Sequence, residues 1–118
     1  ALVGFSQGTM MSLHVGLRRA VSPVAIVGYS GAMVGGERLG AELKGRPPVL
    51  LVHGDADEML PVSRMHDAVK ALEAAQVPVQ WHVSPGLGHG IDGTGLALGG
   101  RFLVDHFARA VSATAVSE

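Results

Sequence analysis

The feature that most constrains the fold of this chain is Ser6, which has a glycine two residues before it and another two residues after it. The segment Gly4–Gly8 reads Gly-Phe-Ser-Gln-Gly, follows the apolar run Ala1–Val3 and precedes a helix-like stretch that opens at Thr9. A strand, this motif and a helix together form the sharp turn called a nucleophile elbow, which presents the serine hydroxyl outside the fold. We expect both flanking glycines because a side chain at either position would collide with the adjoining strand or helix. The turn predicts that Ser6 is a nucleophile.

Composition excludes several classes of function. Hydrophobic residues make up 47% of the chain and the net charge is −1, with no basic stripe or acidic run, so we expect no nucleic-acid partner. The absence of cysteine excludes disulfides, cysteine-based zinc sites and a thiol nucleophile, and it fits the reducing cytoplasm, where we expect the protein. The apolar run Val49–Val52 is far too short to span a bilayer.

Strand-like and helix-like segments alternate along the chain. Apolar runs predict strands at Ala1–Phe5, Pro23–Tyr29, Pro48–His53 and Pro78–Val83. Helical spacing predicts helices at Gln7–Arg19, Ser63–Gln76 and Gly93–Val111, with a short helix around Glu37–Leu43. Continuous apolar strands indicate burial on both faces, which is typical of a parallel sheet covered by helices. We predict an α/β fold with about four parallel strands and flanking helices, and no domain boundary within residues 1–118.

Each long helix has a predicted apolar stripe. In Ser63–Gln76 the stripe comprises Met65, Ala68, Val69, Leu72 and Ala75. The first helix places Met10, Met11, His14 and Leu17 toward one side, and the last helix has a stripe with Leu96, Leu103, Phe107 and Val111. The pair Gly99-Gly100 inside the last helix marks either close packing on the sheet or a break in the helix.

Polar residues follow three of the predicted strands, at the edge where function collects in open parallel sheets. Ser6 follows the first strand, Asp55 and Asp57 follow the third, and His89 follows the fourth. A neutral imidazole accepts the proton of an attacking serine, and a carboxylate holds that imidazole in the required tautomer. We therefore expect Ser6, Asp57 and His89 to be catalytic. The backbone N–H of Gln7, directly after the nucleophile, is an expected oxyanion donor.

Each of these assignments has an alternative. Asp55 lies nearer the strand, where it can satisfy loop amides, so Asp57 is the preferred acid. His89 is the preferred base because flanking glycines leave its ring free to reach a neighbour, whereas we expect His53, at a strand end, to support the adjoining loop. Ser30 also follows a strand but lacks the second elbow glycine, so we interpret it as a loop residue. No histidine pair has metal-ligand spacing with a third partner, so we expect no metal site.

With these residues in place, the chain resembles the carboxylesterase branch of the α/β-hydrolase fold, which also contains acyl-protein thioesterases and lysophospholipases. The matching segments are Gly4–Gly8, Leu51–Asp57 and Gly86–His89. The resemblance implies hydrolysis of small carboxylic esters, with short to medium acyl groups, or of thioesters, without metal or cofactor. A non-catalytic interaction module with the same fold is the alternative from another class.

Apolar residues flank the predicted catalytic loops at Met59, Leu60 and Leu87. They are expected to line an acyl pocket, and packing on the core is the other interpretation.

The resemblance also implies that a part of the fold is absent. The family's first strands, and the loop that gives its second oxyanion amide, have no counterpart here, so we expect residues 1–118 to be the C-terminal portion of a single α/β-hydrolase domain. The strand Ala1–Phe5 should then have an unpaired edge. Exposed apolar edges favour association, so we expect the missing N-terminal half, or a second copy in a homo-oligomer, to cover it.

Overall fold

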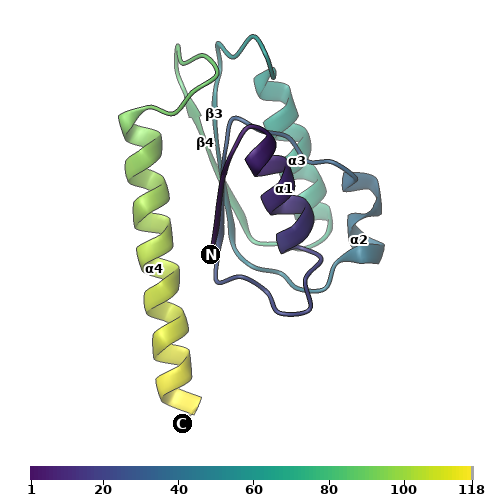
Figure 1. The fold of residues 1–118 in the computed structure, drawn as a ribbon, viewed down its shortest axis with the longest axis vertical. Coiled ribbons are helices and arrows are strands. Elements are labelled where there is room, and N and C mark those ends of the chain that lie inside the picture. Colours follow the sequence, from purple (N-terminus) through teal and green to yellow (C-terminus); the bar gives the residue numbers. More distant parts are fainter. Residues whose placement is uncertain (118) are drawn as a thin grey trace.

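The computed structural model describes residues 1–117, and the side chains of residues 1–112. Four parallel strands form one sheet in the order β1-β2-β3-β4 (Figure 1). The strands are β1 (Leu2–Phe5), β2 (Ile26–Tyr29), β3 (Val49–Gly54) and β4 (Val79–Ser84). The helices are α1 (Gln7–Gly16), the 3₁₀ turn η1 (Gly36–Arg38), α2 (Leu39–Glu42), α3 (Val62–Ala74) and α4 (Gly93–Ser117). Each predicted strand and helix is present, with shifted ends, and the predicted α/β fold class is confirmed.

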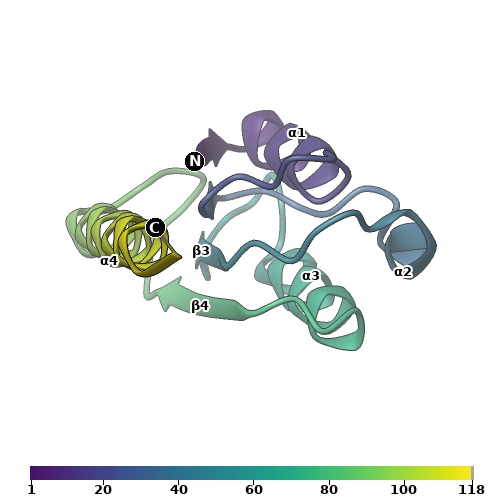
Figure 2. The same cartoon turned by 90° about the horizontal axis from the view of Figure 1, so that it is seen from below.

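The helices cover both faces of the sheet. Figure 2 shows α1 and α3 on one side and α4 on the other. The core on the α1 and α3 side is the larger one, and its buried members are Leu13, Leu17, Ile26, Leu39, Val49, Leu51, Met65, Ala68, Val69, Leu72 and Val77. The predicted stripe of α3 lies on this core, with Ala75 only partly buried at its end. Strands β2 and β3 are buried along their whole length, as the continuous apolar runs predicted.

A second core lies between the sheet and α4. It comprises Ala25, Val27, Tyr29, Leu50, Val52 and Phe102. The Tyr29 hydroxyl donates a hydrogen bond to the carbonyl of Gly95 (3.0 Å), and burial raises the pKa of the Tyr29 phenol, so this group remains a donor. A Cβ at Gly99 would lie 2.0 Å from that hydroxyl, whereas one at Gly100 would meet nothing within 4 Å. Gly99 therefore marks close packing of an unbroken helix on the sheet.

Two predicted stripes are buried only in part. Leu17, just after α1, lies in the larger core and Leu103 of α4 packs against the second core, but most other members of the two stripes are exposed. In α1 the buried side chains are Thr9 and Leu13, while Met11 and His14 are exposed. In α4, Phe102 packs on the sheet, and the exposed residues include three members of the predicted stripe, Leu96, Phe107 and Val111. Small residues such as Thr9 and Gly99 face the sheet where these helices approach it closely, so the bulky apolar side chains do not mark the buried face.

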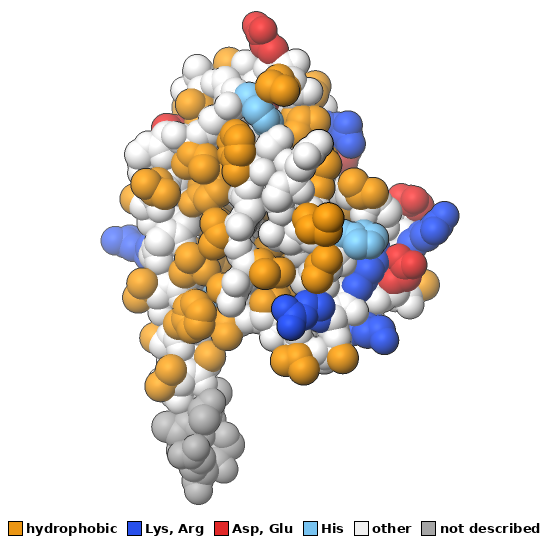
Figure 3. Space-filling model, in the orientation of Figure 1, with side chains coloured by type: hydrophobic (Ala, Val, Ile, Leu, Met, Phe, Trp, Pro, Cys, Tyr) orange, Lys and Arg blue, Asp and Glu red, His pale blue; other side chains and the backbone are white. Residues whose placement is uncertain are grey.

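Strand β1 lies at the edge of the sheet and, within residues 1–117, pairs only with β2. Val3 and Phe5 are in register with Val27 and Tyr29, so their side chains point to the face of the sheet that α4 covers further along. They remain 57% and 43% exposed, so β1 is not the buried strand that the sequence predicted, although its expected unpaired edge is present. Figure 3 shows hydrophobic side chains gathered over this side of the molecule, along α4.

The two neighbouring glycines of α4 provide a matched test of the packing. Gly99→Ala should lower the free energy of unfolding by about 1–3 kcal/mol, because its methyl group displaces the buried Tyr29 hydroxyl. Gly100→Ala should raise the free energy of unfolding by about 0.5–1 kcal/mol, since alanine favours the helix and meets no neighbour. Urea unfolding of the purified protein measures both, and equal effects of the two substitutions would contradict the close packing.

Candidate active site

The turn between β1 and α1 has the conformation of a strained elbow. Ser6 has φ 55° and ψ −114°, a backbone region rarely occupied by residues other than glycine and one that costs about 1–3 kcal/mol. Its N–H donates to the carbonyl of Tyr29 (2.9 Å), and its carbonyl accepts from the N–H of Thr9 (3.0 Å), so neighbouring elements hold the turn on both sides.

The two elbow glycines have different surroundings. A Cβ at Gly4 would lie 2.4 Å from the carbonyl group of Gly8, so the close approach of β1 and α1 requires glycine at this position. A Cβ at Gly8 would meet nothing within 4 Å. The expected collision is therefore correct for Gly4, where a side chain would meet the backbone of Gly8. It is wrong for Gly8, where a side chain would meet no neighbouring atom.

Three of the residues singled out in the sequence come together above the carboxyl ends of the strands. His89 Nε2 lies 3.0 Å from Ser6 Oγ, and His89 Nδ1 lies 2.7 Å from Asp57 Oδ2. A carboxylate only accepts hydrogen bonds, so Nδ1 carries the ring proton and Nε2 is free to accept the serine proton. This order of groups is the one that general-base activation of a serine requires.

The Asp57 side chain is fully buried and accepts several hydrogen bonds. Its Oδ1 accepts from the backbone N–H groups of Met59 (2.9 Å) and Leu60 (2.8 Å), and its Oδ2 accepts from His89. Burial by itself would raise the pKa of Asp57, but the hydrogen bonds from Leu60, His89 and Met59 outweigh it and hold the pKa below its ordinary value. The group is therefore a carboxylate at neutral pH.

Asp55 has a different position. It is exposed, and its Oδ1 accepts from the N–H of Gly86 at 2.7 Å. Two backbone hydrogen bonds run beside this contact, from the N–H of Asp55 to the carbonyl of Ser84 (3.3 Å) and from the N–H of Ala56 to the carbonyl of Leu87 (3.0 Å). Asp55 therefore satisfies a loop amide, as expected, and ties the loop after β3 to the loop that carries His89.

Two further residues contact the His89 loop and were not assigned to the site from the sequence. The Phe5 ring lies 5.1 Å from the His89 ring, centroid to centroid, at an interplanar angle of 44°. The buried Ser30 hydroxyl donates to the carbonyl of Gly90, the residue directly after His89, at 2.8 Å. Phe5 belongs to the elbow motif itself, and Ser30 carries the same signal as the others, a polar residue at a strand end.

The other candidate residues surround this centre. Gln7 is the first residue of α1, where backbone N–H groups have no acceptor within the helix and can face an anion. Met59 is exposed, and Leu60 and Leu87 are partly buried, on the two loops that carry Asp57 and His89.

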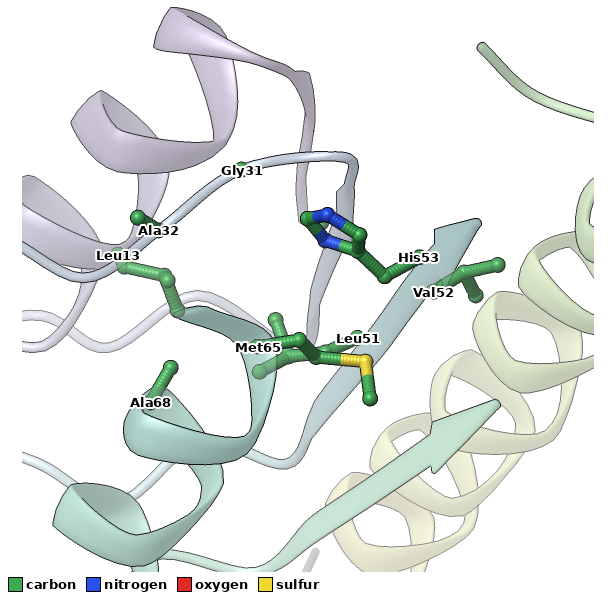
Figure 4. Close-up of a pocket in the computed structure, with 9 residues that line it drawn as sticks. Leu13, Gly31, Ala32, Leu51, Val52, His53, Met65 and Ala68 are labelled. Carbon is green, nitrogen blue, oxygen red and sulfur yellow. The ribbon is translucent and has the colours of Figure 1, made fainter. Parts of the chain in front are cut away.

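The small cavity in Figure 4 is separate from the Ser6–His89 contact. Its volume is about 10 Å³, and it is lined by residues of α1, β2, β3 and α3 and of the segment after β2, with His53 near the carboxyl end of β3. Ligand pockets are typically about 300–1,000 Å³, so this space holds no substrate.

Neither a metal-ligand cluster nor a helix suited to cross a membrane is present in the described part of the chain. No group of three or more His, Asp or Glu side chains there lies close enough to hold a metal ion. Among its helices, none combines the length and the apolar character that a membrane crossing requires.

Comparison with known proteins identifies relatives of the chain. The profile of the phospholipase/carboxylesterase family matches residues 1–106. Acyl-protein thioesterase 1 of Gibberella zeae is 31% identical over 93 residues, which cover 75% of this chain and 40% of that protein. The crystal structure of esterase PE8 has a TM-score of 0.84 at 43% identity, covering 87% of this chain and 48% of that one. A phospholipase/carboxylesterase from Dyadobacter fermentans DSM 18053 has a TM-score of 0.68 at 33% identity, covering 81% and 47%.

A parallel sheet with an elbow serine after one strand and its acid and histidine after later strands is the arrangement of the α/β-hydrolase fold, and this chain has part of that fold. Because the family profile spans most of the sequence, the chain belongs to the phospholipase/carboxylesterase family. The resemblance drawn from the sequence is confirmed. The chain spans less than half the length of each of the three relatives.

The lowered pKa of Asp57 predicts a pH dependence of stability. The folded-state pKa lies below the unfolded-state value of about 3.9, so the unfolded chain binds more protons between the two values. The contribution of Asp57 is therefore complete above the unfolded-state pKa and is lost as the pH falls through the folded-state pKa. Urea unfolding from about pH 7 down to about pH 3 should show a smaller loss of stability in Asp57→Asn than in the wild type.

Asp55→Asn is the matched control for this measurement. It makes the same chemical change at an exposed position of the same loop, so it shows how much of a difference between variants is particular to the buried Asp57. If the free energy of unfolding changes with pH equally in the wild type and in Asp57→Asn, the Asp57 carboxylate does not stabilise the fold.

Proposed function

We propose that this chain carries the catalytic residues of a serine carboxylesterase that hydrolyses short to medium acyl esters of small molecules. The observation that carries the proposal is the hydrogen-bonded series Asp57, His89 and Ser6, with contacts of 2.7 Å and 3.0 Å. A non-catalytic module has no need for this alignment of three side chains from separate loops, so the geometry favours the enzyme.

In the proposed mechanism, His89 Nε2 takes the Ser6 proton as Oγ attacks the ester carbonyl. Asp57 holds the Nδ1–H tautomer of His89 and stabilises the imidazolium that forms. The tetrahedral intermediate then collapses, the alcohol leaves with the proton from His89, and the acyl group remains on Ser6. A water molecule, deprotonated by the same imidazole, hydrolyses this acyl-enzyme and restores the serine.

The oxyanion of each intermediate needs donors close to Ser6. The N–H of Gln7 is the proposed donor within this chain, since it follows the nucleophile at the start of α1. We place the second donor in polypeptide outside residues 1–118. Loss of one such donor typically lowers turnover by about a hundred- to a thousandfold.

The acyl group is proposed to lie against Met59, Leu60 and Leu87, the apolar residues of the two catalytic loops. Thioester hydrolysis is the second candidate, favoured by the identity with the acyl-protein thioesterase of Gibberella zeae, and lysophospholipid hydrolysis uses the same groups. The mechanism uses no metal or cofactor. The lack of cysteine favours a cytoplasmic location.

We also propose that residues 1–118 form the C-terminal portion of one α/β-hydrolase domain. The unpaired edge of β1, the exposed Val3 and Phe5 beside it, and the length of the relatives support this proposal. The partner on this edge is then the N-terminal half of the same domain, and a second copy of the chain is the alternative partner.

Substitutions in the full-length protein test the catalytic assignment. We expect Ser6→Ala and His89→Ala to lower kcat by about a millionfold, and Asp57→Asn by about ten-thousandfold. Asp55→Asn should lower kcat by less than about tenfold, because its carboxylate contacts a loop amide and not His89. Hydrolysis of nitrophenyl esters measures all four, and a larger loss in a folded Asp55→Asn than in Asp57→Asn would overturn the choice of acid.

The same assay separates the proposal from its alternatives. Residues 1–118 alone should be at least about a hundredfold less active than the full-length protein, since they lack one oxyanion donor. Equal activity would contradict the proposed second half of the site. Activity that EDTA abolishes and zinc restores would contradict the metal-free mechanism.

A further inference from the structure

We infer that His53 is a positioning residue that holds the Asp57 carboxylate and the turn Asp57–Leu60 in line with His89. The inference rests on the proposed function. His53 occupies the end of β3, its imidazole is only 1% exposed, and the mechanism above gives it no part in proton transfer. A buried imidazole needs hydrogen-bond partners, and the partners of this one belong to the catalytic acid's own turn.

The contacts of His53 define its tautomer. Its Nε2 lies 2.7 Å from the carbonyl oxygen of Leu60, which can only accept, so Nε2 carries the proton and donates. The same nitrogen lies 3.4 Å from Asp57 Oδ2. That oxygen is the one that accepts from His89, so it lies between the Nε2–H of one imidazole and the Nδ1–H of the other.

These contacts hold the turn Asp57–Leu60 through both backbone groups of Leu60. The N–H of Leu60 donates to Asp57 Oδ1, and the carbonyl of Leu60 accepts from His53, so both backbone groups of Leu60 are engaged. Rotation of the carboxylate away from His89 would break the Leu60 contact and move Oδ2 away from His53. His53 thereby couples the catalytic acid to Leu60, a residue proposed to contact the acyl group.

The lining of the cavity beside His53 offers no substitute for its N–H. The cavity beside it is lined by Leu13, Gly28, Gly31, Ala32, Leu51, Val52, Met65 and Ala68, and His53 is its one polar side chain (Figure 4). At about 10 Å³ the cavity is at the lower limit for one water molecule. Loss of the imidazole therefore leaves the Leu60 carbonyl without a side-chain donor from this group of residues.

Three variants of the full-length enzyme separate positioning from simple packing. His53→Phe keeps the ring but removes the donor, and we expect kcat to fall by about ten- to a hundredfold with KM changed by less than about twofold. His53→Gln places an N–H close to the position of Nε2 and should recover most of that loss. Met65→Leu changes the same cavity without touching a hydrogen bond, so it should lower stability and leave kcat unchanged.

His53→Asn provides the comparison if the phenylalanine variant does not fold. Its amide is one bond shorter than that of glutamine and does not reach Leu60, so its kcat should be lower than that of His53→Gln. Equal kcat in the Gln and Asn variants, or a loss in Met65→Leu as large as in His53→Phe, would overturn the inference.

Proton NMR supplies a readout that needs no turnover. The Nδ1–H of His89, held to Asp57, should give a low-field resonance that disappears in His89→Ala. We expect this resonance to move or vanish in His53→Asn and to persist in Met65→Leu. The protein could show this pattern, a changed resonance in His53→Asn and an unchanged one in Met65→Leu, and yet have no esterase activity. In that case the proposed function fails and the positioning role stands. An unchanged resonance and an unchanged kcat in the His53 variants would overturn the positioning role alone.

Discussion

The buried carboxylate of Asp57 is the interaction on which the candidate site depends. Carboxylates are costly to bury unless hydrogen bonds replace water, and Asp57 is buried with two backbone N–H groups on one oxygen and His89 on the other. The same bonds fix the loop after β3 and orient the imidazole after β4. Together with the hydrogen bonds that Asp55 and Ala56 make to the loop after β4, the Asp57 carboxylate joins the two loops, and it reaches Ser6 through the His89 ring.

The strained turn at Ser6 is the third structural element of the candidate site, after the loops that carry Asp57 and His89. A serine at φ 55° is unfavourable by itself, and the structure holds it through the bond to Tyr29 and the close approach of α1 that Gly4 permits. Tyr29 also anchors α4 through its hydroxyl, so β2 holds Ser6 on one side and the last helix on the other. The core and the site therefore share residues, and packing changes at Gly99 act on an element that also holds the elbow.

Local patterns predicted the fold and the candidate residues because both depend on short-range signals. Apolar runs of strand length, helical spacing around Met65, and polar residues at strand ends are visible without knowledge of tertiary contacts. The faces of α1 and α4 were not predictable in this way, because close packing places Thr9 and Gly99 against the sheet and leaves larger side chains outside. The positions of Ser30 and His53 at strand ends are visible in the sequence, and the expected contact of His53 with the adjoining loop is present, but the contact of Phe5 with His89 depends on a loop path that no spacing rule describes.

The central claim is that Ser6 is a nucleophile activated by His89 and Asp57. Labelling of the full-length protein with a fluorophosphonate, followed by mass spectrometry of its peptides, tests this claim most directly. The account predicts one covalent adduct, on Ser6, that is lost in His89→Ala and unchanged in Ser12→Ala, a serine of α1 outside the site. An adduct on another serine, or none in a protein that hydrolyses esters, would contradict it.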